Sequence, residues 1–286
     1  MGGRPFSMLC LFASDLHGSR RRYDRLLEAV AERQPEVLLL GGDLLPGLGG
    51  EDDGSRQTAI EGLVEGLERL GRSRPRVFFI PGNDDPRAAI EEQLKDGIER
   101  GLLEPLHMRR VQLGGHPLLG YACVPPSPFQ LKDWERYDVS RFTDPGCVSP
   151  EQGMRSVPVD PSDLRYGTIA GDLEKLARGL DLERAICLFH APPYRSSLDR
   201  AALDGMSVEG VPLDLHVGSI AVRRFIEERG PLITLHGHVH EAARLTGAWE
   251  ERIGRTLALT AAHDGPELAL VGFEPDDPQG ATRELL

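Results

Sequence analysis

The feature that most constrains the fold is a repeated alternation of short apolar runs with segments of helical periodicity. The runs cover residues 9–13, 37–40, 77–80, 185–189 and 232–235, and they are apolar throughout rather than alternately polar. Strand–helix–strand repeats of this kind indicate βαβ units. Continuously apolar strands are typical of a sheet that is covered on both faces. The sequence therefore predicts an α/β fold built from βαβ units.

The spacing of apolar residues predicts helices over residues 20–33, 58–70, 86–100, 172–178 and 219–229. Gln34-Pro35 is expected to end the first helix, Pro86 suits the first position of the third, and Ser219 is a good N-cap for the last. Residues 46–55, rich in Gly and Asp, are expected to form a loop. The apolar runs 256–260 and 268–271 are expected to pair as a closing hairpin. Because there is no internal repeat or linker, we expect one domain over residues 1–286.

All five apolar runs end in residues that can bind a metal ion. In open α/β sheets ligands bind outside the carboxyl ends of the strands, so this shared position is stronger evidence than any single residue. Carboxylate and imidazole ligands suit Mn, Fe, Co, Zn or Ni, and an amide oxygen can be a neutral ligand. Two such ions about 3.5–4 Å apart can clamp a phosphoryl group. The candidate metal ligands are Asp15, His17, Asp43, Asn83, His190, His238 and His240.

Taken singly, most of these residues have a purely structural alternative. Asp15 could cap a turn, and Asp43 could cap the Gly-rich loop that follows it. Asn83 could hold a left-handed turn. His190 could be a hydrogen-bonded histidine of the core. The case for a metal site therefore depends on the set as a whole.

His238 and His240 favour a metal site more directly, because alternate residues of an extended segment face the same side. Asp85 directly precedes Pro86, so we expect its carboxylate to cap a helix N-terminus. The other histidines that could be considered, His107, His116 and His263, lack such a context.

Residues 125 to about 165 break the regular alternation. They are rich in Pro, Asp, Ser and aromatic residues and show no clear periodicity. A connection of this length is unusual unless it is functional or disordered, and Trp134, Tyr137 and Phe142 argue against disorder. We expect an ordered excursion near the face that carries the metal ligands. Trp134 and Tyr137 either stack on an aromatic part of a substrate or form a small satellite core.

Charge and composition narrow the possible partners. The 286-residue chain has a formal net charge of −12, which argues against a long nucleic acid as the substrate. The four cysteines form no CxxC pair and favour a reducing compartment. The apolar run near the N-terminus is too short for a signal peptide, and no run approaches the roughly 20 residues of a membrane span. We expect a cytoplasmic protein without a membrane partner.

Five motifs occur in a characteristic order: Asp15-Leu16-His17, Gly42-Asp43, Gly82-Asn83, His190 and Gly237-His238-Val239-His240. In this combination the chain resembles the calcineurin-like metallophosphoesterase superfamily over about residues 9–240. The resemblance implies a four-layer sandwich in which two mixed β-sheets pack together and are flanked by helices. It also implies two divalent transition-metal ions, drawn from Mn, Fe, Zn, Ni or Co, with a hydroxide between them as the nucleophile.

The resemblance further implies which residue holds which ion. One ion would be bound by Asp15, His17 and His240, the other by Asn83, His190 and His238, with Asp43 as the bridge.

Two positions depart from the family pattern. Many members carry a histidine after the Gly-Asn pair that assists the leaving oxygen, and here this position is Asp84. A carboxylate there would repel phosphate unless it is protonated or turned away, and an aryl ester would depend less on such assistance. Pro46 stands where relatives often have an acidic residue, and we expect it to affect the metal ligands little.

A narrower likeness is to the Icc-related prokaryotic phosphoesterases. It is carried by the Asn83-Asp84 pair, by Pro-Pro-Ser-Pro at 125–128 and by Asp-Trp-Glu-Arg at 133–136. His216, followed by Val-Gly-Ser, and Glu241 add to it. Asp84 and His216 are therefore the candidate catalytic residues. His216 either lines the substrate pocket or packs beside the start of the late helix.

These patterns predict a metal-dependent phosphoester hydrolase. Because Asp84 replaces histidine, we favour a phosphodiesterase acting on small or nucleotide-like substrates. Two alternatives stay open: a phosphomonoesterase or protein phosphatase, and a non-catalytic metal-binding scaffold for a protein partner. A dinucleotide-dependent oxidoreductase is excluded, because the first strand leads into Ser-Asp-Leu-His-Gly rather than a GxGxxG turn. Nothing in these patterns specifies an oligomeric state.

Overall fold

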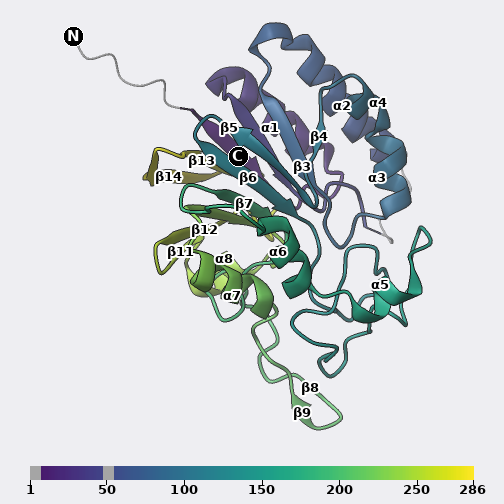
Figure 1. Ribbon diagram of the computed structural model, residues 1–286. Coiled ribbons are helices and arrows are strands. Elements are labelled where there is room, and N and C mark those ends of the chain that lie inside the picture. Colours follow the sequence, from purple (N-terminus) through teal and green to yellow (C-terminus); the bar gives the residue numbers. More distant parts are fainter. Residues whose placement is uncertain (1–7, 48–54) are drawn as a thin grey trace.

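Two six-stranded sheets lie at the centre of the protein, in a computed structural model that describes residues 8–47 and 55–286 (Figure 1). The first sheet has the order β14 (Asp277–Leu285), β13 (Ala269–Glu274), β1 (Cys10–Ala13), β2 (Val37–Gly41), β3 (Arg76–Ile80) and β4 (Glu104–Pro105). The second has the order β11 (Glu250–Ile253), β12 (Thr256–Thr260), β10 (Ile233–His236), β7 (Ile186–Phe189), β6 (His116–Tyr121) and β5 (Arg109–Leu113).

Helices cover the outer face of each sheet. The first sheet is flanked by α1 (Arg20–Arg33), α2 (Ser55–Arg69), α3 (Arg87–Gln93) and α4 (Lys95–Glu99), with the 3-10 turn η1 (Gly71–Ser73). The second is flanked by α6 (Ile169–Ala177) and α7 (Ile220–Arg229). The short helices α5 (Pro161–Tyr166) and α8 (Ala242–Thr246) lie in connections, and β8 (Ser207–Val208) pairs with β9 (Val211–Pro212) in a hairpin that projects from the body (Figure 1).

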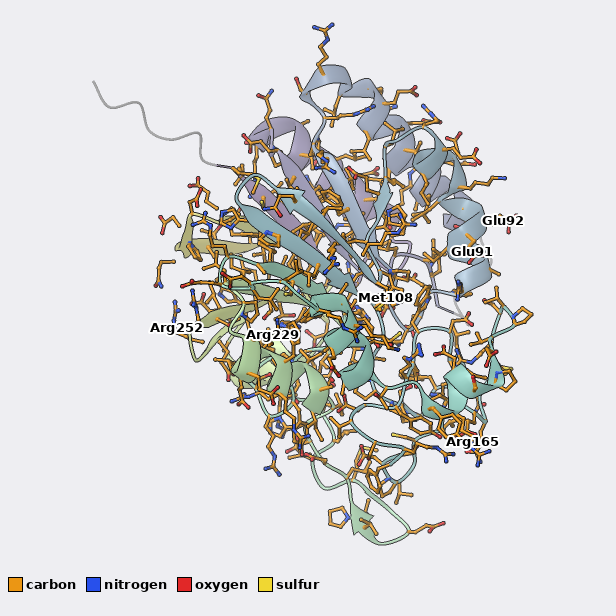
Figure 2. All side chains as sticks on the ribbon, viewed as in Figure 1. Glu91, Glu92, Met108, Arg165, Arg229 and Arg252 are labelled. Atoms are coloured by element: carbon orange, nitrogen blue, oxygen red, sulfur yellow. The ribbon has the colours of Figure 1, made fainter. Side chains whose placement is uncertain are left out.

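The core explains why the central strands are apolar at every position. Along β1, Cys10 and Phe12 belong to the cluster that joins the two sheets, whereas Leu11 and Ala13 pack with the helices of the first sheet. Successive side chains of a strand point to opposite faces, so both faces need apolar residues. The outer faces of the helices carry exposed charged side chains, such as Glu91 and Glu92 of α3 (Figure 2). The predicted α/β fold with four layers is confirmed.

The pairing pattern is what positions the functional residues. β1, β2 and β3 are parallel to one another. In the second sheet β6, β7, β10 and β12 are also parallel. β13 pairs antiparallel with β1, and β11 pairs antiparallel with β12, so both sheets are mixed. The carboxyl ends of the parallel strands within each sheet therefore lie at one edge.

Most predicted helix ends agree with the structure. α1 ends at Arg33, and Gln34 is left-handed with φ 48°. The Ser219 hydroxyl accepts the N–H of Val222 and caps α7 as predicted. The helix expected at 86–100 is instead two helices separated at Leu94, with Pro86 as the N-cap residue rather than the first helical residue. α6 begins at Ile169, three residues early, because Thr168 caps it.

The predicted closing hairpin is wrong. β12 lies in the second sheet and β13 in the first, and each makes an antiparallel pair with a different strand, β11 and β14. Apolar runs identify strands but do not identify their partners. Residues 48–54 of the expected Gly-rich loop lie outside the described residues. Within the described ranges, no helix is both long enough and apolar enough to cross a bilayer.

Candidate metal centre

The loops that follow β1 and β2 are hydrogen-bonded to each other just beyond the first sheet. The N–H of Asp15 donates to the carbonyl of Gly42 at 2.9 Å, and the N–H of His17 donates to the carbonyl of Asp43 at 2.8 Å. The parallel pairing of β1 with β2 continues into these loops. It brings the side chains of both loops to the same edge of the sheet.

Four of the candidate ligands have a left-handed backbone. The φ angles are 58° at Asp15, 46° at His17, 50° at Asp43 and 74° at His238. Non-glycine residues in this region cost on the order of 1–3 kcal/mol each and cluster at functional sites. The fold therefore holds these side chains in directions that an ordinary strand or helix would not give them.

One group of donor atoms comes together beside these loops. Ligand atoms of Asp15, His17, Asp43 and His240 all lie within 4.8 Å of one another. The Nε2 atoms of His17 and His240 are 3.1 Å apart, and His240 Nε2 is 3.3 Å from Asp15 Oδ1. Asp15 Oδ2 is buried and has no hydrogen-bond partner among the described residues. A cation would satisfy this oxygen, and the donor set fits a divalent transition metal.

A second group lies on the other side of Asp43. His190 Nε2 is 3.1 Å from Asn83 Oδ1 and 3.3 Å from Asp43 Oδ2. Asp43 Oδ2 is also 3.9 Å from His17 Nε2, so this carboxylate lies between the two groups. The rings of His190 and His238 have centroids 5.3 Å apart.

The tautomer of His190 is set by the backbone. Its Nδ1–H donates to the carbonyl of Gly41 at 2.7 Å. In the neutral imidazole the lone pair is then on Nε2, which faces Asp43 and Asn83. This is the form in which histidine binds a metal.

The expectation that His238 and His240 lie on an extended segment is wrong. β10 ends at His236, and His238 adopts the left-handed conformation. As a result His240 contacts Asp15 and His17, whereas the ring of His238 lies beside His190. The N–H of His238 donates to Asp15 Oδ1 at 3.0 Å, which ties this turn to the loop after β1.

Two glycines leave the space that these ligands occupy. A Cβ on Gly82 would lie 2.2 Å from Asp43 Oδ1 and 2.6 Å from His190 Nε2. A Cβ on Gly237 would lie 2.1 Å from Ser14 Oγ and 2.7 Å from Asp15 Oδ2. Any larger residue at either position would displace a ligand.

The electrostatics of the cluster keep its carboxylates ionised. Burial opposes ionisation of Asp43, but the charge and hydrogen bond of His190 lower the net pKa below its usual value. Asp43 in turn outweighs burial at His190 and raises the pKa of that imidazole to about 10. Burial lowers the pKa of His238 to about 3, so this ring is neutral. Ionised carboxylates are the form that binds metal.

Asp84 is close to the cluster but partly exposed. Its side chain is 37% exposed, and Oδ2 is 3.8 Å from His17 Nδ1. Burial and the nearby charge of Asp43 raise its pKa. Its Oδ1 accepts a hydrogen bond from Asn83 Nδ2 at 2.9 Å, which turns the Asn83 oxygen toward His190.

Asp85 does not cap α3, contrary to the prediction. Its carboxylate accepts the N–H groups of Leu45 at 2.7 Å, Gly82 at 2.9 Å and Leu44 at 3.1 Å. It therefore joins the loops after β2 and β3. Other side chains accept hydrogen bonds from the N–H groups at the start of α3. Asp133 Oδ2 accepts the N–H of Arg87, and Ser156 Oγ accepts the N–H of Ala88.

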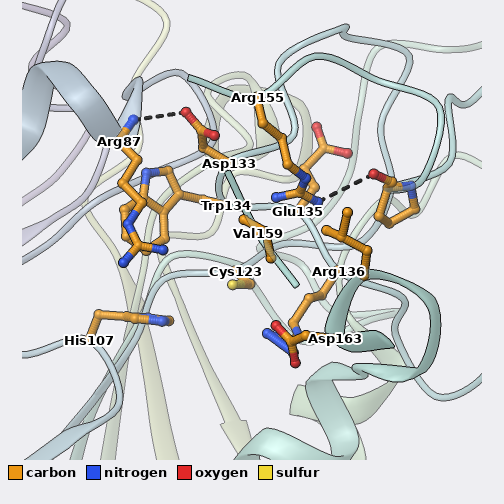
Figure 3. A pocket seen from close by; sticks show the side chains of 12 residues that line it. Arg87, His107, Cys123, Asp133, Trp134, Glu135, Arg136, Arg155, Val159 and Asp163 are labelled. Atoms are coloured by element: carbon orange, nitrogen blue, oxygen red, sulfur yellow. Dashed lines mark hydrogen bonds and ion pairs between the residues drawn. The ribbon is translucent and has the colours of Figure 1, made fainter. Parts of the chain in front are cut away.

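The excursion begins at the carboxyl end of β6 and contains a small pocket. The cavity has a volume of about 70 Å³ and is lined by residues that include Arg87, Trp134 and Arg155 (Figure 3). Trp134 and Tyr137 are 8% and 3% exposed, and Trp134 belongs to the main core. Both rings are packed in the protein interior, which favours the alternative in which they form part of a core. Phe142 is exposed.

His216 pairs with a residue that the sequence did not single out. Its Nδ1 lies 2.7 Å from Oδ1 of Asp199, which is fully buried. Burial raises the pKa of Asp199, and the hydrogen bond from His216 opposes that shift. His216 comes seventeen positions after Asp199, with a hairpin between them, so no local pattern connects the two residues.

Arg22 was missed as well. Its guanidinium donates to the carbonyls of Asp15 and Gly265, and so links the loop after β1 to the loop after β12. In sequence it is one of three consecutive arginines, 20–22. Only the inward direction of its side chain distinguishes it from its neighbours.

Comparison with known proteins agrees with this geometry. The family model for calcineurin-like phosphoesterases matches residues 8–242, which contain all seven candidate ligands. The chain therefore belongs to the calcineurin-like phosphoesterase family. No curated protein matches the sequence significantly.

Solved structures share the fold at low sequence identity. The protein TT1561 of Thermus thermophilus has a TM-score of 0.58 at 13% identity, and the alignment covers 98% of this chain and 99% of that one. A dimetal phosphatase from Danio rerio has a TM-score of 0.55 at 13% identity, covering 94% of this chain and 92% of that one. At such identities the likeness concerns the fold.

Proposed function

We propose that this chain is a phosphoester hydrolase that works with two divalent transition-metal ions. The observation that carries the proposal is the position of Asp43, whose carboxylate lies between the His17 side and the His190 side of the cluster. The ligands of one ion would be Asp15, His17 and His240, and those of the other Asn83, His190 and His238, with Asp43 shared. Two ions held by these residues would supply activation of a water molecule and stabilisation of the phosphoryl charge.

The chain's own residues supply the rest of the reaction. Asp43 and Asp15 stay ionised, and His190 is held in one tautomer by Gly41. Asp84 orients the amide of Asn83, and its partly exposed carboxylate lies beside His17, where we expect the substrate to bind. A second negative charge on the substrate would be repelled there. This favours phosphodiesters, with one charge, over phosphomonoesters, with two.

The proposed substrates are small or nucleotide-like phosphodiesters, and the proposed location is the cytoplasm. The acidic chain supports a small substrate over a long nucleic acid. That the Danio rerio structure is described as a phosphatase keeps monoester hydrolysis as the alternative. A non-catalytic scaffold is the other alternative, although a scaffold has no need of buried, aligned metal ligands.

The test is metal-dependent hydrolysis of bis-p-nitrophenyl phosphate beside p-nitrophenyl phosphate. The protein is stripped of metal and reloaded with Mn or Zn, and Asp43→Asn is compared with Asp96→Asn, which alters an exposed carboxylate on α4. Diester turnover that needs metal and is lost only in Asp43→Asn is the expected result. Faster monoester turnover would favour the phosphatase. Absence of turnover with two metals bound would favour the scaffold.

A further inference from the structure

The loop between β7 and α7 contains a carboxylate that is fixed in one orientation. Asp199 is fully buried, and its oxygens accept the N–H groups of Arg195 and Ser196 at 2.9 Å and of Gly218 at 3.2 Å. Three backbone donors leave this side chain little freedom. Among the described residues, the side chain that hydrogen-bonds to it is that of His216.

The pairing with Asp199 fixes the His216 imidazole. Because a carboxylate only accepts, Nδ1 carries the proton of this 2.7 Å hydrogen bond. The other nitrogen, Nε2, makes no hydrogen bond to any of the described residues, and the side chain is 31% exposed. An imidazole held in this way presents Nε2 to solvent or to a ligand, as an acceptor when neutral and as a donor when protonated.

This pair lies beside the loop that carries two of the metal ligands. Val217, the next residue after His216, packs against the cluster that contains Val239, the residue between His238 and His240. The N–H of Ala202 also donates to Glu241 Oε1 at 2.9 Å. Both loops leave the carboxyl ends of the adjacent parallel strands β7 and β10. The pair of His216 and Asp199, called the dyad below, is thus at the same edge of the second sheet as the histidine ligands.

We propose that His216 is the proton donor to the leaving oxygen and that Asp199 is its positioning residue. The proposal rests on the function proposed above. As the oxygen of a water molecule bonds to phosphorus, that water releases one proton to solvent. At the same time the bond from phosphorus to the leaving oxygen breaks, and its electron pair stays on that oxygen. The leaving oxygen takes the proton from Nε2 of the imidazolium, and the neutral ring regains a proton from solvent.

The experiment measures how hydrolysis depends on the leaving group. Metal-loaded wild-type protein and His216→Gln are compared on aryl methyl phosphodiesters that release p-nitrophenol, p-chlorophenol or phenol. General acid catalysis contributes about 10²–10⁴-fold when the leaving oxygen is basic. His216→Gln is expected to lower kcat/KM about 100-fold for the phenyl ester but less than about fivefold for the p-nitrophenyl ester.

Two further variants separate positioning from folding. Asp199→Asn is expected to give the same leaving-group pattern with a smaller loss, because the imidazole remains but its tautomer is no longer fixed. Asp214→Asn is the matched control: this carboxylate accepts the His216 backbone N–H and the Tyr194 hydroxyl without touching the imidazole. Nitrogen-15 NMR of wild type should show the Nδ1–H tautomer of His216, and Asp199→Asn should lose it.

The outcomes are distinguishable. Equal losses across the three esters, with a lowered melting temperature, would reduce the dyad to a structural contact at the base of the hairpin and overturn the proposal. If both variants show the same leaving-group dependence as wild type, the proposal for His216 and Asp199 is also overturned, but the proposed phosphoesterase function is not affected. If wild type hydrolyses none of the esters with metal bound, the proposed function fails and the dyad's role fails with it.

Discussion

The indole N–H of Trp134 donates a hydrogen bond to the carbonyl oxygen of Asp85 at 2.8 Å. This contact joins the irregular excursion to the loop that carries Asn83 and Asp84. A buried carbonyl that loses its donor costs about 1–3 kcal/mol. We therefore expect Trp134→Phe to lower the free energy of unfolding by about this amount in urea titrations. Trp249→Phe, which alters the only other tryptophan, is the control, and an equal effect in both would remove the special role of the Asp85 contact.

Metal loading is expected to stabilise the protein. A ligand that binds only the folded state adds about 2.7 kcal/mol when its free concentration is about 100 times its Kd. Scanning fluorimetry of stripped protein titrated with Mn should therefore show a rise in melting temperature. Asp43→Asn should lose most of this rise, because Asp43 lies between both groups of ligands. A full rise in the variant would show that the ions bind elsewhere.

Gly82→Ala is expected to damage the metal centre. Its Cβ would lie 2.2 Å from Asp43 Oδ1, so the carboxylate must move. We expect roughly a tenfold or greater loss of metal affinity in equilibrium dialysis. Gly62→Ala, in α2, meets nothing within 4 Å and should leave metal affinity unchanged. The same substitution should stabilise the helix by about 0.5–1 kcal/mol.

The buried ion pair of Lys132 and Glu135 should be sensitive to the loss of one partner. Both side chains are 0% exposed and in direct contact. Removing one charge from such a pair costs about 3–5 kcal/mol, whereas replacing both by apolar residues is often neutral. Glu135→Gln should therefore lower the urea midpoint strongly, and Lys132→Met with Glu135→Leu should recover much of the loss. Additive losses in the double variant would contradict this account.

His107 should make the metal-free protein sensitive to acid. Burial lowers the pKa of His107 to about 3 in the folded state, against about 6.5 for an ordinary histidine. Between these values only the unfolded state binds the proton. The stabilisation is complete above about pH 6.5 and falls by about 1.4 kcal/mol per unit as the pH decreases toward about 3.

The measurement is the urea midpoint between about pH 7 and about pH 4.5 in the presence of a chelator. His107→Gln retains an acceptor for the N–H of Ala122, which His107 Nδ1 accepts at 2.9 Å. The free energy of unfolding of this variant should depend less steeply on pH than that of wild type, because the variant takes up about one proton fewer on unfolding. Parallel curves for the two proteins would mean that His107 remains accessible to protons in the folded state.

The sequence reveals residues whose role follows from their position on a strand. Asp15, Asp43 and His190 each follow an apolar run, and parallel strands bring such ends to one edge. The same reasoning failed where partners had to be chosen: β12 and β13 are recognisable strands, but nothing local assigns them to different sheets. Asp85 was misjudged because a carboxylate before proline suits a cap, while two of its actual partners lie 41 and 40 residues away. Asp199 was missed because its partner His216 is also distant in the sequence.

The proposed ligands are divided between the two sheets. Asp15, His17, Asp43 and Asn83 follow strands of the first sheet, whereas His190, His238 and His240 follow strands of the second. Ions bound by all seven would act as a crosslink between two layers that are also joined by apolar packing and by hydrogen bonds such as that from His190 to Gly41. Slow amide exchange in β2 and β7 should then become correlated, since neither sheet can open without releasing its ligands. Catalysis and the mechanical cohesion of the sandwich would depend on the same few bonds.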